Sequence, residues 1–392
     1  MAKSPLFTPP KYFQDVVFHR HTNRSVGWLE LFYDLVYVAT LIQIGNFLSD
    51  NITLLGFGQF LVLTVVVWWA WTGETFYQNR FVVDDIKHRL LVFVQIFAIA
   101  AMGLSVSKAF GELYIQFTLA YIVTRVVLFL MYVRAAKVDK EGRALSNGYL
   151  IGFGGGTAIW LGSLFLPAEI HWVGWLAGIA FEFFLPFLPQ FQRWARDMVF
   201  DRHHMSERFG IFTIIVLGEA FVKILDDAQG TTLGLPQFVF SIFGFLVLNS
   251  IWWLYFGETE EKIVNQETVW KPIAWMYSHA LVAASLVAFG VGAKKLYAAT
   301  LEHPEDPVYE PYRLLYTTAV VMFLFALALI DYGLDHESKK NIQSVIHLFS
   351  SLVIVIIGLT ATGANAILFV ALISIVMVAQ VLYDVYVARQ AG

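Results

Sequence analysis

The sequence predicts an all-α integral membrane protein with about twelve transmembrane helices. Hydrophobic residues make up 58% of its 392 residues and charged residues only 14%, whereas soluble domains carry about 25% charged residues. Apolar runs of the length that crosses a bilayer, about 20 residues, recur along the chain. The mean hydropathy of +0.64 agrees with this composition. We therefore expect a polytopic bundle of helices.

Twelve apolar runs are expected to span the membrane, with edges placed to within several residues. The first six lie near 28–48, 58–78, 88–110, 112–134, 148–166 and 171–188. The last six lie near 207–225, 238–258, 273–294, 312–332, 342–360 and 364–388. The short runs 112–134 and 342–360 could instead tilt or re-enter the membrane.

The connections between these runs differ in basic charge. If the N-terminus is inside, the inner connections hold 20 of the 26 Lys and Arg residues and the outer connections hold five. Because cytoplasmic loops are enriched in Lys and Arg, both termini are predicted to be cytoplasmic. Residues 1–27 carry four basic residues and no secretory signal, so we expect them to form a cytoplasmic segment.

The chain is predicted to contain two six-helix repeats, 28–188 and 207–392. The segment 189–206 between them intersperses arginines with aromatic residues, which suits a cytoplasmic linker formed by an amphipathic helix on the inner leaflet. A shift of 184 residues places WWAWTGET at 68–75 on WWLYFGET at 252–259, with five identities in eight positions. An even number of spans in each repeat predicts parallel repeats related by an axis along the membrane normal.

The first predicted helix carries two carboxylates, Glu30 and Asp34, inside the apolar run GWLELFYDLVYVA. Their spacing places both on one helical face. Two ionised acids there would repel, so one is expected to hold its proton unless a cation or a basic side chain lies close. Acids inside a span favour a functional site. In the alternative, Glu30 is hydrated at the inner interface and Asp34 pairs with Arg208 or Arg125.

The seventh predicted helix supplies four further candidates. Glu207 and Arg208 lie at its N-terminal end. Glu219 is the acidic residue expected to lie deepest in the membrane. Lys223 follows Glu219 by one helical turn. Glu219 is therefore either a coupling residue of a transport site or the partner of Lys223 in an intrahelical ion pair.

Four histidines could bind a proton or a metal ion. His203 and His204 have ligand spacing with Glu207, but a solvated helix start explains them equally well. His279 and His347 could relay protons near neutral pH, although a lone buried histidine is more often a hydrogen-bonded packing residue. We keep His279 as a candidate coupling residue and expect no metal and no cofactor, because the spacing does not favour a haem.

Arg125 lies in the fourth predicted helix and cannot lose its charge. It therefore requires a nearby carboxylate, and the candidates are Glu182, Asp34 and Glu219. We expect Arg125, Glu182 and Lys223 to serve in structural ion pairs.

Aromatic and glycine patterns indicate membrane packing. Six aromatic residues are expected to form belts at the inner interface: Trp68, Trp69, Trp71, Trp252, Trp253 and Tyr255. Two groups of glycines predict close helix packing rather than phosphate binding: Gly152, Gly154, Gly155 and Gly156 in one run, and Gly174 and Gly178 in the next.

Composition limits the classes of function. The chain has no cysteine, which excludes disulfides and thiolate sites. No nucleophile elbow or zincin motif is present, so an enzyme is not expected. The net charge of −4 indicates no nucleic-acid partner. The expected partners are the lipid bilayer and a small ion or solute, and a homodimer is left open.

Four segments resemble the low temperature requirement A membrane protein family. They are WLELFYDLVYVA from Trp28, SERFGIFTIIVLGEA from Ser206, IWWLYFGET from Ile251 and YSH from Tyr277. The hydrophobic pattern between them is similar to that of the family along nearly the whole chain. The resemblance implies a bacterial-type protein of the plasma (inner) membrane whose biochemical activity is poorly defined.

A fainter similarity is to the two-repeat lysosomal potassium channels, whose first helices carry Phe-Ser-Asp preceded by Arg. Phe32, Tyr33 and Asp34 resemble that motif with Ser replaced, and Arg208 with Phe212 resembles the Arg-to-Phe spacing. No Arg precedes Phe32 at that spacing and no Asp follows Phe212. Pore geometry is therefore not carried over to this chain.

We interpret the sequence as an ion- or proton-coupled secondary transporter with a buried acidic site. The alternatives are a cation channel of the potassium type and a non-transporting membrane scaffold or sensor. The residues expected to bind or couple the substrate or ion are Glu30, Asp34, Glu207, Arg208, Glu219 and His279.

Overall fold

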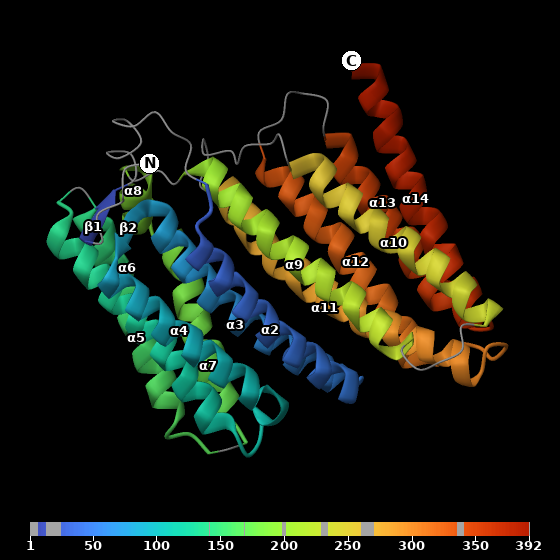
Figure 1. The fold of residues 1–392 in the computed structure, drawn as a ribbon, viewed down its shortest axis with the longest axis horizontal. Coiled ribbons are helices and arrows are strands. Elements are labelled where there is room, and N and C mark those ends of the chain that lie inside the picture. The colour runs from blue at the N-terminus through green and yellow to red at the C-terminus, as the bar shows by residue number, and fades with distance from the viewer. Residues whose placement is uncertain are drawn as a thin grey trace. The chain divides into compact units, whose positions relative to one another are not determined.

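A computed structural model describes most of the chain, and it is overwhelmingly helical (Figure 1). The described residues are 7–12, 25–140, 142–167, 169–197, 201–228, 234–259, 270–334 and 341–391. The predicted N-terminal segment 1–27 and the predicted linker 189–206 lie partly outside these residues.

Each of the twelve predicted runs coincides with a helix. In the first half these are α2 (Trp28–Asp50), α3 (Leu54–Arg80), α4 (Ile86–Ser105), α5 (Tyr114–Val138), α6 (Arg143–Ser163) and α7 (His171–Phe184). In the second half they are α9 (Arg202–Ala228), α10 (Leu235–Thr259), α11 (Trp270–Glu302), α12 (Glu310–Gly333), α13 (Asn341–Thr360) and α14 (Ala366–Ala391). A further helix, α8 (Pro189–Asp197), occupies the first part of the predicted linker.

Nine of the helices in the described residues are long and apolar enough to cross a membrane. They are α2 to α5, with α4 extended by a 3-10 turn to Lys108, and α10 to α14. The other three of the twelve are α6, α7 and α9; α7 has only 14 residues, which is short for the hydrocarbon core. A polytopic helical membrane protein is thus confirmed, while the count of twelve spans stays a prediction.

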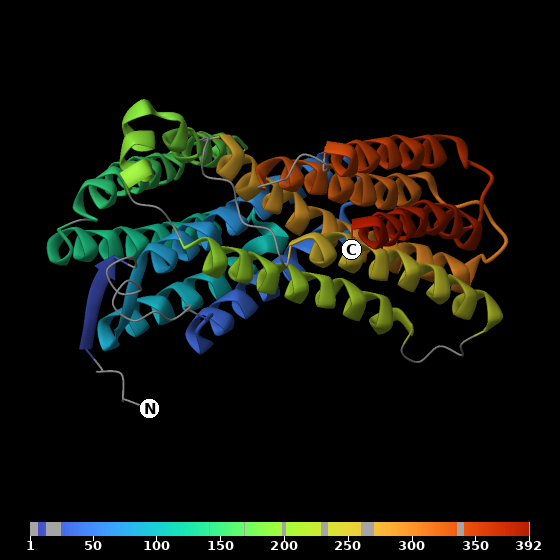
Figure 2. The same ribbon diagram turned by 90° about the horizontal axis from the view of Figure 1, so that it is seen from above.

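The chain forms two compact units. Unit 1 comprises Met1–Phe47 and Val62–Ile211, and unit 2 comprises Leu48–Leu61 and Phe212–Gly392. In unit 1, α5 packs against α4 and α6, and α6 packs against α7 (Figures 1 and 2). In unit 2, α12 packs against α11 and α13, and α14 packs against α10 and α13. The helix α9 begins in unit 1 and continues in unit 2.

Polar side chains accept hydrogen bonds from free backbone amides at several helix starts. Thr53 accepts from Gly56 at the start of α3, and Asn365 accepts from Leu368 at the start of α14. Asp85 caps α4 by accepting from the His88 amide. These short polar residues between apolar runs explain why the helix starts lie close to the predicted edges.

Asp85, which lies in β2 between two candidate spans, also connects the start of α4 to α5. Both of its carboxylate oxygens accept hydrogen bonds from Arg134 of α5. Burial alone would raise the pKa of Asp85, but the hydrogen bonds from Arg134 and from the His88 amide hold that pKa below its ordinary value. The carboxylate is therefore ionised at neutral pH.

The structure contains a small sheet that the sequence did not predict. The strand β1 (Phe7–Tyr12) pairs antiparallel with β2 (Phe81–Asp85), which connects α3 to α4. The register is irregular between Thr8 and Lys11, where two prolines lack the amide hydrogen that a ladder needs. Such short strands far apart in sequence leave too weak a pattern to predict.

Glycines allow α6 and α7 to approach closely, as predicted. A Cβ atom at Gly152, Gly155 or Gly156 would collide with side chains of α7 or of the turn after it. In return, a Cβ atom at Gly174 or Gly178 of α7 would collide with α6. Helices in membranes associate through such small-residue contacts because lipid supplies no hydrophobic driving force.

The prediction of an interfacial aromatic belt is wrong for the tryptophans of α3. Trp68, Trp69 and Trp71 are at most 8% exposed. The indole N–H of Trp69 donates to Glu182, and that of Trp71 donates to Asp34. Buried carboxylates need hydrogen-bond donors, and this need places the indoles inside unit 1.

Candidate functional site

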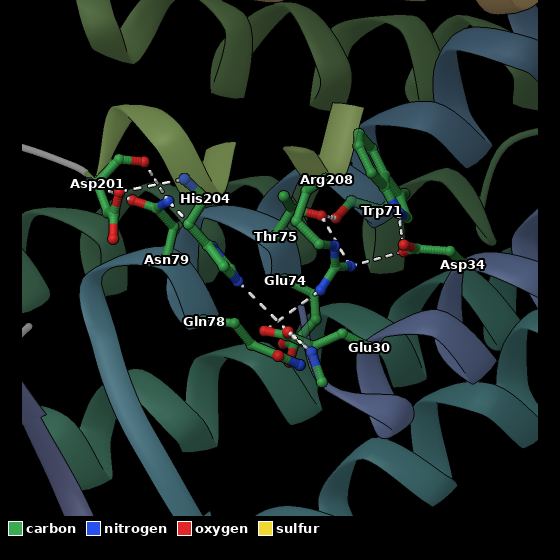
Figure 3. Close-up of polar contacts among 11 residues, drawn as sticks. Glu30, Asp34, Trp71, Glu74, Thr75, Gln78, Asn79, Asp201, His204 and Arg208 are labelled. Atoms are coloured by element: carbon green, nitrogen blue, oxygen red, sulfur yellow. Dashed lines mark hydrogen bonds and ion pairs between the residues drawn. The ribbon is translucent and has the colours of Figure 1, made fainter. Parts of the chain in front are cut away.

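Five ionisable side chains form a buried charged cluster in unit 1 (Figure 3). They are Glu30 and Asp34 of α2, Glu74 of α3, and His204 and Arg208 from the first two turns of α9. None of the five is more than 5% exposed. We refer to these five residues as the charged cluster.

Arg208 is the only guanidinium of the charged cluster. Its Nη2 donates to Asp34 Oδ1 at 2.6 Å, and its Nη1 lies 3.4 Å from Glu30 Oε1. The Trp71 indole donates to the same Asp34 oxygen at 2.6 Å, and Arg208 lies over that ring. The alternative in which Asp34 pairs with Arg208 is therefore the arrangement that the structure has.

Glu30 is buried rather than hydrated at an interface. Its Oε2 accepts from the Gly27 amide at 2.7 Å, at the start of α2. The positive end of the helix dipole favours a carboxylate there. The same oxygen lies 3.4 Å from His204 Nε2, and the other lies near Arg208. Glu30 therefore connects the start of α2 to α9.

Asn79 fixes the tautomer of His204. Its Oδ1 accepts from the Asp201 amide at 2.9 Å and its Nδ2 donates to the Asp201 carbonyl at 2.8 Å, which sets the orientation of the side-chain amide. Nδ2 also lies 3.3 Å from His204 Nδ1. Because Nδ2 can only donate, His204 Nδ1 accepts and Nε2 carries the proton that points to Glu30. A second proton on Nδ1 would face a donor, so this arrangement favours a neutral His204.

Glu74 is a member of the charged cluster that sequence reasoning did not select. Gln78 donates to its Oε1 at 2.7 Å, whereas Glu74 Oε2 and Asp34 Oδ2 are buried with no hydrogen-bond partner among the described residues. Glu74 was noted only as part of the repeated WWxxxGET pattern. Its position as an acid inside a predicted span was the signal that could have identified it.

Acids outnumber bases among the five members of the charged cluster. Three carboxylates lie together with one guanidinium and one imidazole. An uncompensated charge in a buried site costs several kcal/mol. The site can avoid that cost by binding a proton or a small cation.

A second buried arginine shows the contrasting arrangement. Arg125 Nη2 donates to Glu182 Oε2 at 2.6 Å, with both side chains at most 1% exposed. The Trp69 indole donates to the same oxygen, and Arg125 Nε donates to the Tyr121 hydroxyl. One carboxylate here matches one guanidinium, which suits the structural pairing predicted for Arg125 and Glu182.

The remaining sequence candidates lie outside the charged cluster. Glu207 is half-buried beside Arg208 in α9. Glu219 and Lys223 are half-buried residues of α9 in unit 2. His203 is exposed at the start of α9. Their roles in coupling or pairing stay predictions.

His279 is also in unit 2, where it joins a neutral hydrogen-bonded chain. Its Nδ1 lies 2.6 Å from the Trp275 carbonyl, which can only accept, so Nδ1 carries the proton. Its Nε2 then accepts from the Tyr255 hydroxyl at 3.0 Å, and Tyr255 accepts from Thr213 at 3.2 Å. These contacts fit the packing interpretation of His279 better than a coupling role.

Comparison with known proteins identifies the family. The family model described as bacterial low temperature requirement A protein (LtrA) matches residues 25–384, which include the whole charged cluster. An uncharacterized protein of Rhizobium meliloti (strain 1021) is 24% identical over 279 residues, which cover 67% of each chain. Because the family model matches nearly the whole sequence, the chain belongs to the bacterial low temperature requirement A protein family.

Proposed function

We propose that this protein is an ion- or proton-coupled secondary transporter of a bacterial plasma membrane, and that the charged cluster is its coupling site. The observation that supports this proposal is the excess of carboxylates in the cluster. Among the described residues, Glu30, Asp34 and Glu74 are buried with Arg208, and one carboxylate oxygen each of Asp34 and Glu74 has no hydrogen-bond partner there. Ionisable groups inside a membrane protein are costly and mark ion or proton pathways.

The cost of the excess charge is also what would drive binding. A carboxylate left uncompensated in a buried site is destabilised by several kcal/mol, and a proton or monovalent cation that enters the site removes that penalty. A balanced pair such as Arg125 with Glu182 gains nothing comparable from a further proton. The proposal therefore assigns coupling to the charged cluster and structure to the balanced pair.

The proposed architecture is a bundle of twelve spans arranged as two parallel six-helix repeats, 28–188 and 207–392, with both termini cytoplasmic. The recurrence of WWxxxGET and the excess of basic residues in the inner connections support it. Reporter fusions at Gly230 and at Gly392, two positions outside the described residues, should localise on opposite sides of the membrane. Localisation on the same side would overturn this topology.

The transport proposal is tested with purified protein in proteoliposomes, with flux measured across pH and cation gradients. Glu74→Gln keeps the side-chain shape and an acceptor for Gln78 but removes the ionisable oxygen. It should lower gradient-driven flux at least tenfold and flatten the dependence of flux on pH. Asp34→Asn should act in the same direction. Glu112→Gln changes an exposed acid and serves as the matched control, with flux unchanged.

The outcomes separate the candidate functions. Flux curves of Glu74→Gln and Asp34→Asn that superimpose on the wild-type curve would end the proposal that the charged cluster couples transport. Passive cation conductance without coupling to a gradient would favour the channel. No movement of any ion under any gradient would favour a scaffold or sensor.

A further inference from the structure

The three acids of the charged cluster differ in the contacts that stabilise their ionised forms. Asp34 has the strongest contacts, because its Oδ1 accepts hydrogen bonds from the Arg208 guanidinium and from the Trp71 indole, each at 2.6 Å. A hydrogen bond between two charged groups is about twice as strong as a neutral one, and donors to a carboxylate favour its ionised form. These contacts suit an ionised Asp34.

Glu30 is also placed as a carboxylate. The Gly27 amide donates to its Oε2 at 2.7 Å at the start of α2, where the positive end of the helix dipole favours an anion. Arg208 Nη1 lies 3.4 Å from its Oε1. Glu30 therefore shares the guanidinium of Arg208 with Asp34.

Glu74 has weaker contacts than either of these acids, although its side chain is fully buried (Figure 3). The Gln78 amide, a neutral donor, reaches its Oε1 at 2.7 Å, and Oε2 has no hydrogen-bond partner within the described residues. A buried carboxylate with so little stabilisation costs several kcal/mol. A neutral acid avoids this cost, because Oε1 still accepts from Gln78 while Oε2 carries the proton.

The other groups around Glu74 leave this difference in place. Arg125 of α5 approaches α3 at Gly73, but its guanidinium pairs with Glu182 at 2.6 Å. Glu30 interacts with Glu74 as a like charge, which opposes a second ionised carboxylate, whereas Arg208 of α9 attracts one. Four tyrosines, which are neutral at neutral pH, also interact electrostatically with Glu74: Tyr33, Tyr37, Tyr77 and Tyr132.

A proton suits these contacts better than a metal cation does. Hard cations bind through several oxygen ligands at once, and within the described residues no group of three or more His, Asp or Glu side chains is arranged to hold a metal ion. The permanent charge of Arg208, bonded to Asp34, would also repel a metal cation. A proton needs only one oxygen, and Glu74 Oε2 provides it.

We propose that the ion bound by the charged cluster is a proton and that Glu74 Oε2 carries it, while Glu30 and Asp34 stay ionised beside Arg208. The role of this proton in coupling rests on the proposed transport function. Its presence on Glu74 is a separate statement about the site, and it is measured without transport.

The test is infrared difference spectroscopy of the full-length protein in lipid nanodiscs, between neutral and strongly alkaline pH. A protonated carboxyl group gives a carbonyl band that an ionised carboxylate lacks. The wild type should show this band at neutral pH and lose it at alkaline pH. Heavy carbon in the carboxyl groups of glutamate, and not of aspartate, should shift the band. Glu74→Gln should remove it, whereas Glu112→Gln, which changes an exposed acid, should leave it unchanged.

Sodium or potassium ions, added at constant neutral pH, distinguish a proton from a metal cation. The band should keep its intensity, because no metal cation displaces the proton. Loss of the band on addition of either ion would overturn the proton assignment. So would the absence of a band at neutral pH, a band that labelled aspartate shifts, or a band that persists in Glu74→Gln.

A second variant keeps the test decisive if Glu74→Gln does not fold. Gln78→Met removes the amide that donates to Glu74 Oε1 and should shift the frequency of the band; an unshifted band would refute the assignment to Glu74. Transport gives a separate answer. A band from Glu74 with unchanged flux in Glu74→Gln would end the transport proposal alone, and lowered flux without the band would end the proton assignment alone.

Discussion

Arg125→Met offers the most quantitative test of how unit 1 is stabilised. In the wild type, the Arg125 guanidinium and the Glu182 carboxylate are 2.6 Å apart and fully buried. The substitution leaves Glu182 with the hydrogen bond from the Trp69 indole, and removing one partner of a buried pair costs about 3–5 kcal/mol. Because every 1.4 kcal/mol is a factor of ten, the ratio of folded to unfolded protein should fall roughly 100-fold or more.

A double mutant separates the loss of the pair from the loss of packing. Glu182→Gln removes the negative charge that Arg125→Met leaves without its guanidinium, but it keeps an acceptor for the Trp69 indole. Replacing a buried ion pair by neutral groups is often nearly neutral, so the double mutant should recover at least about 2 kcal/mol relative to Arg125→Met. Lys108→Met is the control, since Lys108 and Glu112 form an exposed pair worth about 0–1 kcal/mol.

The measurement is reversible denaturant unfolding of the purified protein in bicelles, supported by folded yield on size exclusion. The reasoning fails if Arg125→Met unfolds within about 1 kcal/mol of Lys108→Met. It also fails if the double mutant is no more stable than Arg125→Met, because the unpaired charge of Glu182 would then not be the origin of the lost stability.

Two further predictions concern packing and pH. Gly156→Ala places a methyl group against Glu182 and should lower the free energy of unfolding by about 1–3 kcal/mol. Gly162→Ala on the same helix meets open space and should leave the stability unchanged. Equal melting temperatures of the two variants would contradict the close packing of α6 and α7. Asp85 has a lowered pKa in the folded state, so its stabilising contribution is present above its unfolded pKa of about 3.9 and is lost as pH falls through the folded pKa. Asp85→Asn should therefore be less stable than the wild type at neutral pH, and the two stabilities should converge once the pH falls below the folded pKa of Asp85. An equal difference in melting temperature at neutral and at acidic pH would refute the role of Arg134.

Sequence reasoning found the helices because long apolar runs are a local property of the chain. Each predicted run is helical, and α8 lies in the segment where an amphipathic helix was predicted. Only the 3-10 extensions and the small sheet needed the structure. The sheet was missed because β1 and β2 pair across about 70 residues and each is short. Their register depends on contacts that no local pattern records.

The candidate site was predicted only in part, for a related reason. Glu30, Asp34 and Arg208 were selected because charges in apolar runs are conspicuous. Glu74 was overlooked because it lies in a motif that was interpreted as a repeat and an aromatic belt. The tautomer of His204 depends on the Asn79 amide and on the backbone of Asp201, a contact over more than 100 positions that no spacing rule contains.

The helix α3 relates the two buried arginine sites of unit 1. Trp69 and Trp71 are two residues apart, which turns their side chains about 200° around the helix axis. Their indoles accordingly donate in different directions, to Glu182 beside Arg125 and to Asp34 of the charged cluster. One motif of α3 therefore supports a balanced pair on one face and, with Glu74, an acid-rich site on the other.

The described side chains of the repeated motif in α10 are arranged differently. Trp252 and Trp253 are 45% and 41% exposed, whereas Tyr255 is buried in a neutral chain with Thr213 and His279. The α3 and α10 copies of the motif are thus alike in sequence and in their place in a helix. The hydrogen bonds from indoles to carboxylates occur with the tryptophans of the α3 copy. Within the described residues, the acid-rich cluster therefore occurs with the α3 copy, and substitutions at Glu74 test its proposed function directly.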